Sequence, residues 1–151
     1  MFLLIGPVKT DLEGVLMNKI ILAAFGLALL AIPAQAQPAD PSGTYLSETG
    51  ETRVRIARCG GAYCGTIISV QGEAKDVNNP DAKLKGRNLV GVQMLSNIQP
   101  TAEGFSGQLY NYKDGKTYTG KMSFAGGKSM QLSGCVLGGL ICRSQTWAKV
   151  N

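Results

Sequence analysis

After Gln37 the chain consists of short strand-like runs separated by turn residues, and this pattern restricts the fold more than any other feature of the sequence. No window of helix length repeats apolar residues every 3.6 positions, whereas the short runs alternate between apolar and polar side chains. The runs are 43–47, 52–58, 65–70, 88–95, 104–112, 117–124, 129–136 and 141–150. Asp114-Gly115, between two of them, is a strong hairpin signal. The sequence therefore predicts an all-β, antiparallel fold.

Several of these runs place apolar side chains on one face only. Tyr118, Met122 and Phe124 alternate with polar residues such as Thr119 and Lys121. One-sided alternation across sequential hairpins fits a sheet that closes around its own core. About eight strands joined in this way make an up-and-down barrel, which either fills with side chains or holds one small ligand.

A polar segment, 71–87, interrupts the series between the third and fourth strands. It contains Pro80, and Asn79-Pro80-Asp81 predicts the start of a short helix, because asparagine is a favourable cap and proline suits a first helical turn. A loop of this length can be a functional lid or can close one end of a barrel. The sequence leaves both interpretations open.

The four cysteines form two close pairs, Cys59 with Cys64 and Cys135 with Cys142, each across a glycine-rich turn. Partners across a hairpin loop lie at a Cα separation that a disulfide tolerates. A zinc site needs different spacing, and a redox-active pair needs Cys-x-x-Cys, which neither pair has. We therefore predict two structural disulfides among the three pairings that four cysteines allow.

The N-terminal residues resemble an export signal. Met17-Asn18-Lys19 is a short basic segment, residues 20–32 are almost entirely apolar, and Ala34-Gln35-Ala36 fits a signal-peptidase site. We interpret 17–36 as a signal peptide, 1–16 as a mis-annotated extension, and 37–151 as one mature domain that is periplasmic or secreted. A retained membrane anchor is the alternative, although an apolar run of this length is short for a membrane span.

The chain has a formal net charge of +5 at pH 7, which could favour an anionic component of the cell envelope. Arg53, Arg55 and Arg58 are the one local concentration of basic residues, and the remaining lysines and arginines are scattered. The plain alternative is an ordinary basic soluble protein. Nothing in the pattern supports a nucleic-acid partner, and after signal cleavage we expect no membrane-spanning segment.

The sequence contains no histidine, which removes catalytic triads, histidine bases and most catalytic metal sites. Oxidised cysteines would leave no thiol nucleophile. Carboxylate pairs in loops, such as Asp76 with Asp81 or Glu48 with Glu51, are more often solvated or capping groups than catalytic ones. We therefore expect neither an enzyme nor a protein that holds a metal or cofactor.

The last run carries different side chains on its two faces. Arg143, Gln145, Trp147 and Lys149 lie on one face, and small residues, among them Ser144, lie on the other. If Trp147 points inward, polar groups stand among apolar ones, as in many binding cavities. If the small residues point inward, the barrel is tightly packed. Alternation alone leaves both orientations open.

The motifs of 41–150, taken in order, resemble the bacterial domain-of-unknown-function family 2147. They are Gly43-Thr44-Tyr45-Leu46, Arg58-Cys59-Gly60, Tyr63-Cys64-Gly65, Asn79-Pro80-Asp81 with Arg87, Asp114-Gly115-Lys116-Thr117-Tyr118-Thr119-Gly120, Gly134-Cys135 and Leu140-Ile141-Cys142-Arg143-Ser144-Gln145-Thr146-Trp147. The resemblance implies an exported, lipocalin-like barrel without an established activity, and it favours an inward Trp147. It also implies a cation–π pair between Tyr45, where family members often have tryptophan, and Arg143.

Together these features predict a non-enzymatic barrel of the cell envelope that binds a small apolar or amphipathic ligand or lipid. The candidate cavity or barrel-end residues are Tyr45, Tyr118, Arg143, Gln145 and Trp147. The alternative is a solid-core barrel that docks an envelope partner through its outer surface.

Overall fold

The computed structural model describes residues 38–151. The predicted signal peptide, 17–36, and the extension before it lie outside the described residues. Within them, no helix is long and apolar enough to cross a membrane.

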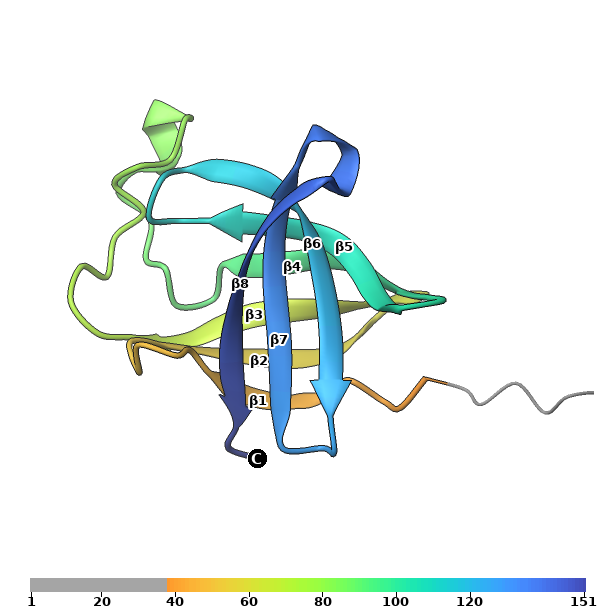
Figure 1. The fold of residues 1–151 in the computed structure, drawn as a ribbon. Helices are drawn as coiled ribbons and strands as arrows, with labels where there is room; N and C mark the ends of the chain where they lie inside the picture. Colours follow the sequence, from red (N-terminus) through yellow and green to blue (C-terminus); the bar gives the residue numbers. More distant parts are fainter. Residues whose placement is uncertain (1–37) are drawn as a thin grey trace, which may run out of the picture. The chain divides into compact units, whose positions relative to one another are not determined.

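Eight antiparallel strands close into one barrel, in which each strand pairs with its neighbours in sequence (Figure 1). They are β1 (Gly43–Leu46), β2 (Thr52–Cys59), β3 (Ala62–Val70), β4 (Gln93–Thr101), β5 (Gly104–Asn111), β6 (Lys116–Ala125), β7 (Ser129–Val136) and β8 (Ile141–Lys149). The barrel closes where Tyr45 and Leu46 of β1 pair with Lys149 and Ala148 of β8. The predicted all-β, up-and-down barrel of about eight strands is confirmed.

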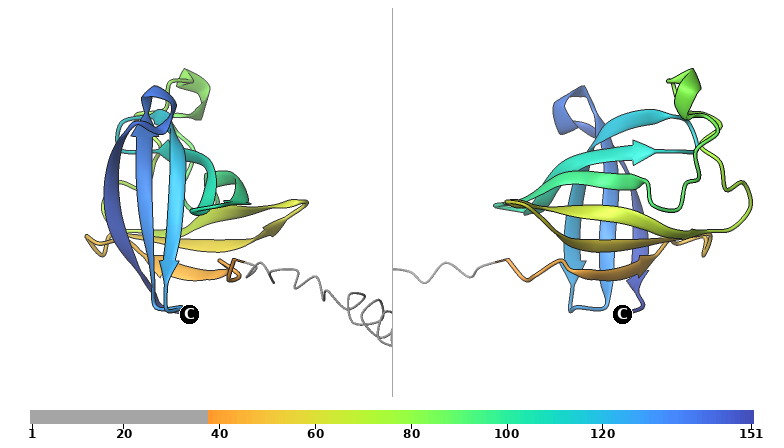
Figure 2. Two further views of the ribbon diagram at one scale, coloured as in Figure 1. Left: turned by 45° about the vertical axis from the view of Figure 1, so that its right-hand side comes forward. Right: turned by 180° about the vertical axis from the view of Figure 1, so that it is seen from behind.

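The strands cross steeply in space, with β6, β7 and β8 running across β1 to β4 (Figures 1 and 2). The connections alternate between the two ends of the barrel. One end, here called the open end, carries the β1–β2 turn, the segment 71–92 and the β5–β6 and β7–β8 hairpins. The other, the closed end, carries the β2–β3, β4–β5 and β6–β7 hairpins and the C-terminus.

The fourth strand was placed too early by the sequence prediction. It spans Gln93–Thr101 rather than 88–95, and it includes Pro100, which lies outside the predicted run. Pairing with β3 ends at Tyr63 opposite Ile98, while pairing with β5 continues to Thr101. Pro100 therefore lies beyond the β3 ladder, where its missing N–H costs no ladder hydrogen bond. The strand also bulges near Asn97, which has a φ of 49°.

The segment between β3 and β4 contains one short 3-10 helix, η1 (Ala82–Leu84), as expected for this position. Its cap is Asp81, whose carboxylate accepts the Lys83 backbone N–H at 2.9 Å. The predicted cap, Asn79, instead donates its side-chain amide to Asp76 and to the hydroxyl of Tyr110. Asparagine suits the contacts with Asp76 and Tyr110 because its side-chain amide supplies two donor hydrogens, whereas a helix cap needs only an acceptor.

Asp76 fixes this segment to the outside of β5. Its buried carboxylate accepts hydrogen bonds from Tyr110 at 2.7 Å, Asn79 at 2.8 Å and Arg87 Nε at 2.9 Å. Burial raises the pKa of Asp76, but these hydrogen bonds and the Arg87 charge outweigh burial and hold the pKa below its usual value. Burial, together with the hydrogen bond to Asp76 and its negative charge, raises the pKa of Tyr110 to about 12, although the Arg87 charge and the Asn79 hydrogen bond act in the opposite direction. Leu89, fully buried, joins the segment to the barrel core.

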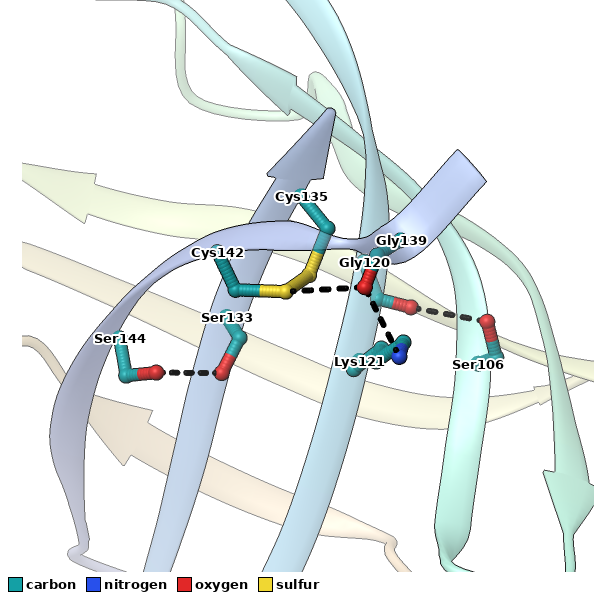
Figure 3. Close-up of a disulfide and its surroundings, with 8 residues drawn as sticks. All are labelled: Ser106, Gly120, Lys121, Ser133, Cys135, Gly139, Cys142 and Ser144. Carbon is teal, nitrogen blue, oxygen red and sulfur yellow. Dashed lines mark hydrogen bonds between the residues drawn. A yellow bond between two sulfur atoms is a disulfide. The ribbon is translucent and has the colours of Figure 1, made fainter. Parts of the chain in front are cut away.

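Both predicted disulfides are confirmed, Cys59–Cys64 with Cα atoms 5.8 Å apart and Cys135–Cys142 at 4.1 Å. They lie at opposite ends of the barrel. The first closes the β2–β3 hairpin at the closed end, and the second joins β7 to β8 at the open end (Figure 3).

The closed end is filled by aromatic rings. Phe105 contacts Phe124 with ring centroids 5.4 Å apart and Tyr63 at 6.1 Å, and Phe124 also contacts Tyr45 at 5.8 Å. The buried Tyr45 hydroxyl donates to the Pro41 carbonyl at 3.0 Å. This end is therefore a packed core.

Candidate functional site

A cavity of about 450 Å³ lies inside the open end of the barrel. Its apolar walls are Met94, Leu109, Leu132, Val136, Ile141 and Trp147. Its polar lining comes from Asn111, Asp114, Tyr118, Arg143 and Gln145. A smaller hollow of about 120 Å³ shares Trp147 and Gln145 and reaches the β1–β2 turn. Apolar walls with a few polar groups, at this volume, are typical of small-molecule sites.

The polar side of the cavity comes from the alternation of β8. Trp147 pairs with the buried Met130 of β7 and is itself only 3% exposed, so this face of β8 points inward. Gln145 and Arg143 lie two and four residues before Trp147 on the same face, and both line the cavity. The orientation left open by alternation is thus the one with Trp147 inside.

Glycine leaves room opposite Arg143. Arg143 pairs with Gly134 on β7, which in turn pairs with Gly120 on β6. A Cβ atom at Gly134 would lie 3.3 Å from Leu109 Cδ2, so even a methyl group there would press on the cavity wall. The absence of side chains on two neighbouring strands keeps this part of the barrel hollow.

Trp147 has an indole N–H without a partner. Among residues 38–151 its Nε1 is the one buried side-chain nitrogen or oxygen that lacks a hydrogen-bond partner. Leaving a buried donor unsatisfied costs about 1–3 kcal/mol. Trp147 lines both hollows, so the residue that carries this unsatisfied donor borders the space available to a bound molecule.

Asp114 and Tyr118 are committed to each other at the rim. The Tyr118 hydroxyl donates to Asp114 Oδ2 at 2.7 Å, and the Lys116 backbone N–H donates to Asp114 Oδ1 at 2.9 Å. Burial raises the pKa of Asp114, but these two hydrogen bonds, together with the Lys116 charge and the Asn111 side chain, outweigh burial and leave the pKa below its usual value. The hydrogen bond to Asp114 raises the pKa of Tyr118. The carboxylate is therefore ionised at neutral pH, and the hydroxyl is already used.

Arg143 carries the free positive charge of the cavity. The two ion pairs within residues 38–151 are Arg87–Asp76 and Lys113–Glu51, so the Arg143 guanidinium forms none. Three side chains on one strand face thus present donors to the cavity: Arg143, Gln145 and Trp147. Such a set suits a molecule that brings acceptors or a negative charge, set against apolar walls.

Four of the five candidate residues line the cavity: Tyr118, Arg143, Gln145 and Trp147. Tyr45 does not, because it is buried at the closed end. The resemblance also implied a pair between Tyr45 and Arg143, which is wrong in this chain. The cation over the Tyr45 ring is Lys149 Nζ, 5.9 Å from the centroid. Lys149 pairs with Tyr45 where the barrel closes, whereas Arg143 lies near the start of β8, toward the other end.

Sequence reasoning missed Asp114 as a lining residue. It was interpreted only as half of a hairpin signal, although a carboxylate in the turn before β6, four residues ahead of an inward tyrosine, could have indicated a polar rim. The apolar wall residues Met94 and Leu132 gave no separate signal, because the same alternation describes a solid core. Within residues 38–151, no three histidine, cysteine, aspartate or glutamate side chains gather as a metal-binding group.

Comparisons with known proteins agree with this architecture. The solved structure of protein HP1028 from the human pathogen Helicobacter pylori, which belongs to the lipocalin family, matches with a TM-score of 0.65 at 24% identity. The match covers 74% of this chain and 84% of that one, and it concerns the fold. No curated protein sequence matches significantly. A family model described as "Uncharacterized protein conserved in bacteria (DUF2147)" matches residues 43–149, the entire barrel, and the chain belongs to that family.

Proposed function

We propose that this protein is an exported, non-enzymatic barrel that binds a small amphipathic molecule in the open-end cavity. One observation carries the proposal: three donor side chains, Arg143, Gln145 and Trp147, stand on one face of β8 against apolar walls. A carboxylate or similar anionic head would accept hydrogen bonds from these donors, while an apolar tail would contact Leu109 and Leu132. The preferred ligand class is therefore a short-chain anionic amphiphile.

Two disulfides support the exported location, because such bonds persist in oxidising compartments. N-terminal sequencing of the protein recovered from the periplasm or medium tests this part. A mature chain that begins at Gln37 would agree with export, and an unprocessed chain in the cytoplasm would overturn it.

The chain provides its own reporter of ligand binding, because Trp147 is its single tryptophan. Decanoate, decanol and decyltrimethylammonium are each titrated into the protein, and the tryptophan fluorescence emission is recorded. We expect decanoate to change the emission at the lowest concentration, because only its head carries a negative charge. No response to any of the three would overturn the proposed site.

Arg143→Gln removes the charge that faces the cavity, and Arg55→Gln, on the exposed face of β2, is the matched control. A charge-assisted hydrogen bond is worth about 1.5–3 kcal/mol, so Arg143→Gln should weaken decanoate binding roughly tenfold to a hundredfold. The control should bind like the parent protein. Equal affinity in the two variants would remove Arg143 from the site.

A further inference from the structure

Exposed apolar side chains concentrate at the open end of the barrel. Within residues 38–151, seven of the eight large exposed hydrophobic residues belong to the segment 71–92 or to the β7–β8 hairpin. They are Val77, Leu84, Val90, Val136, Leu137, Leu140 and Ile141. The remaining one is Val150, near the C-terminus. Such a one-sided distribution marks an interaction surface, whereas isolated exposed residues would be scattered over the molecule.

The most exposed of these residues form the tip of the β7–β8 hairpin. Leu137, the first residue of the 3-10 turn η2 (Leu137–Gly139), is 69% exposed, and Leu140, which directly follows this turn, is 85% exposed. The Cys135–Cys142 disulfide closes the hairpin directly below this tip, and Lys121 Nζ donates to the Gly139 carbonyl at 3.3 Å (Figure 3). The position of the apolar tip is therefore fixed by a disulfide below it and by a hydrogen bond to β6.

Leu137 has neither a packing nor a backbone reason to be leucine. Its φ of 53° lies in the left-handed region, which asparagine or glycine would occupy with less strain. Its side chain is largely exposed, so burial in the barrel does not compensate for that strain. A strained residue that keeps an apolar side chain in water indicates selection for an external contact.

Basic side chains accompany the apolar ones at this end. Leu84 in η1 stands between Lys83 and Lys85, both exposed and neither in an ion pair. Both η1 and η2 project beyond the same end of the barrel (Figures 1 and 2). Of the acidic residues of this end, Asp76 and Glu51 are paired with Arg87 and Lys113, and Asp81 caps η1 beside the two lysines without forming an ion pair. Exposed apolar tips flanked by free lysines match the chemistry of an anionic bilayer surface.

We propose that the open end docks on an anionic lipid membrane, with Leu137 and Leu140 inserted among the acyl chains and Lys83 and Lys85 at the headgroups. This inference goes beyond ligand binding, because it concerns residues that do not line the cavity. It places the cavity mouth, where Val136 and Ile141 stand, against the bilayer. An amphipathic molecule could then pass between membrane and cavity without crossing water.

Vesicle flotation tests the docking surface. The experiment uses protein recovered after export and signal cleavage, with its mass verified, because the apolar residues 20–32 would bind vesicles on their own. Vesicles of phosphatidylcholine with and without phosphatidylglycerol are compared. We expect binding to the anionic vesicles that weakens with added salt. A parent protein that does not float with anionic vesicles overturns the proposal.

Two variants with one control locate the contact. Leu137→Asn/Leu140→Asn should lower the vesicle-bound fraction about tenfold or more, since both apolar groups are lost from the interface. Lys83→Gln/Lys85→Gln should lower it roughly threefold to tenfold and reduce its salt dependence. Val150→Asn, which removes the exposed apolar residue outside this surface, should bind like the parent.

Decanoate-dependent Trp147 emission provides a check of folding and separates the two proposals, because neither leucine lines the cavity. The Leu137→Asn/Leu140→Asn variant should keep that response while losing vesicle binding. If this variant floats as well as the parent, the apolar tip does not contact lipid. If the parent instead forms a concentration-dependent dimer that the variant loses, and does not float, the surface binds a second copy and the membrane proposal is wrong.

Discussion

The two ends of the barrel use the same eight strands, yet one is packed with aromatic rings and the other surrounds a cavity. At the closed end the inward positions hold Tyr45, Phe105 and Phe124, whose rings contact one another. At the open end the corresponding strands contribute Gly120 and Gly134. Side chains alternate between inward and outward positions in both halves, so the size of the inward side chains decides whether the barrel is solid.

The polar groups of the two ends also differ in how they are satisfied. At the closed end the Tyr45 hydroxyl donates to Pro41, and Lys149 donates to the Ser42 carbonyl at 3.0 Å. At the open end the Trp147 N–H lacks a partner and Arg143 lacks an ion pair. The polar side chains named at the closed end are thus hydrogen-bonded within the protein, whereas the open end has donors without a partner. The difference separates the part of the molecule that stabilises the fold from the part that is available for binding.

The largest expected effect on stability comes from the closed end. Phe105→Ala should lower the free energy of unfolding by about 3–5 kcal/mol, because it opens a cavity among packed rings. Leu132→Ala should cost only about 2 kcal/mol, because its side chain already borders a hollow. Urea unfolding with an unchanged m-value measures both. An equal or larger loss for Leu132→Ala would mean that the two ends are packed alike.

The disulfides allow a second comparison of the ends. Cys59→Ser/Cys64→Ser and Cys135→Ser/Cys142→Ser should each lower the free energy of unfolding by about 2–3 kcal/mol, since the closed loops are similarly short. Only the second pair of substitutions should weaken the decanoate response of Trp147, because Cys142 lines the cavity. An equal loss of response in both variants would show that the cavity depends on the whole barrel.

Asp76 tests how firmly the segment 71–92 is held at the open end. Asp76→Asn should cost about 1.5–3 kcal/mol, because one carboxylate oxygen becomes an amide donor facing the donors of Asn79 and Arg87.

The pH dependence of that loss has a definite sign. The folded pKa of Asp76 lies below its ordinary value of 3.8, so its contribution is complete above that pH and is lost as the pH falls through the lower folded pKa. The difference between parent and Asp76→Asn stability, measured by urea unfolding, should therefore shrink in acid. A difference independent of pH down to complete protonation would assign the loss to packing.

Local sequence patterns were sufficient for seven of the eight strands and for both disulfides. Alternation and turn residues lie within one hairpin, and both disulfides join partners across a single hairpin, so neither depends on distant parts of the chain. The prediction of the fourth strand failed because the extent of this strand depends on the strands with which it pairs. Pro100 is tolerated because the pairing with β3 ends before it. No pattern within residues 93–101 indicates where that pairing ends.

The cavity required information that no single strand contains. Inward orientation of Trp147 followed from the family resemblance, and Arg143 and Gln145 then followed by alternation. Whether their surroundings are hollow depends on the summed volumes of side chains from five strands, β4 to β8. The implied pair of Tyr45 with Arg143 failed for a related reason. The register of β1 against β8 brings Lys149, and not Arg143, beside Tyr45.

The smallest predicted effect concerns two inward glycines in neighbouring environments. At Gly107 of β5 an added Cβ would lie 2.6 Å from the Ser96 carbonyl oxygen and 3.0 Å from that of Asn97, both backbone atoms of the bulged β4. At Gly134 it would meet Leu109 Cδ2 at 3.3 Å, a side-chain atom that can move toward the cavity.

Gly107→Ala should therefore cost about 1–3 kcal/mol through overpacking, and Gly134→Ala less than about 1 kcal/mol. Thermal or urea unfolding measures both, and decanoate titration of Gly134→Ala shows whether the methyl group obstructs the site. If Gly134→Ala destabilises the barrel as much as Gly107→Ala does, Leu109 has no space into which to move. The open end would then be as rigidly packed as the closed one, since a true cavity must accept a displaced side chain more readily than a backbone bulge does.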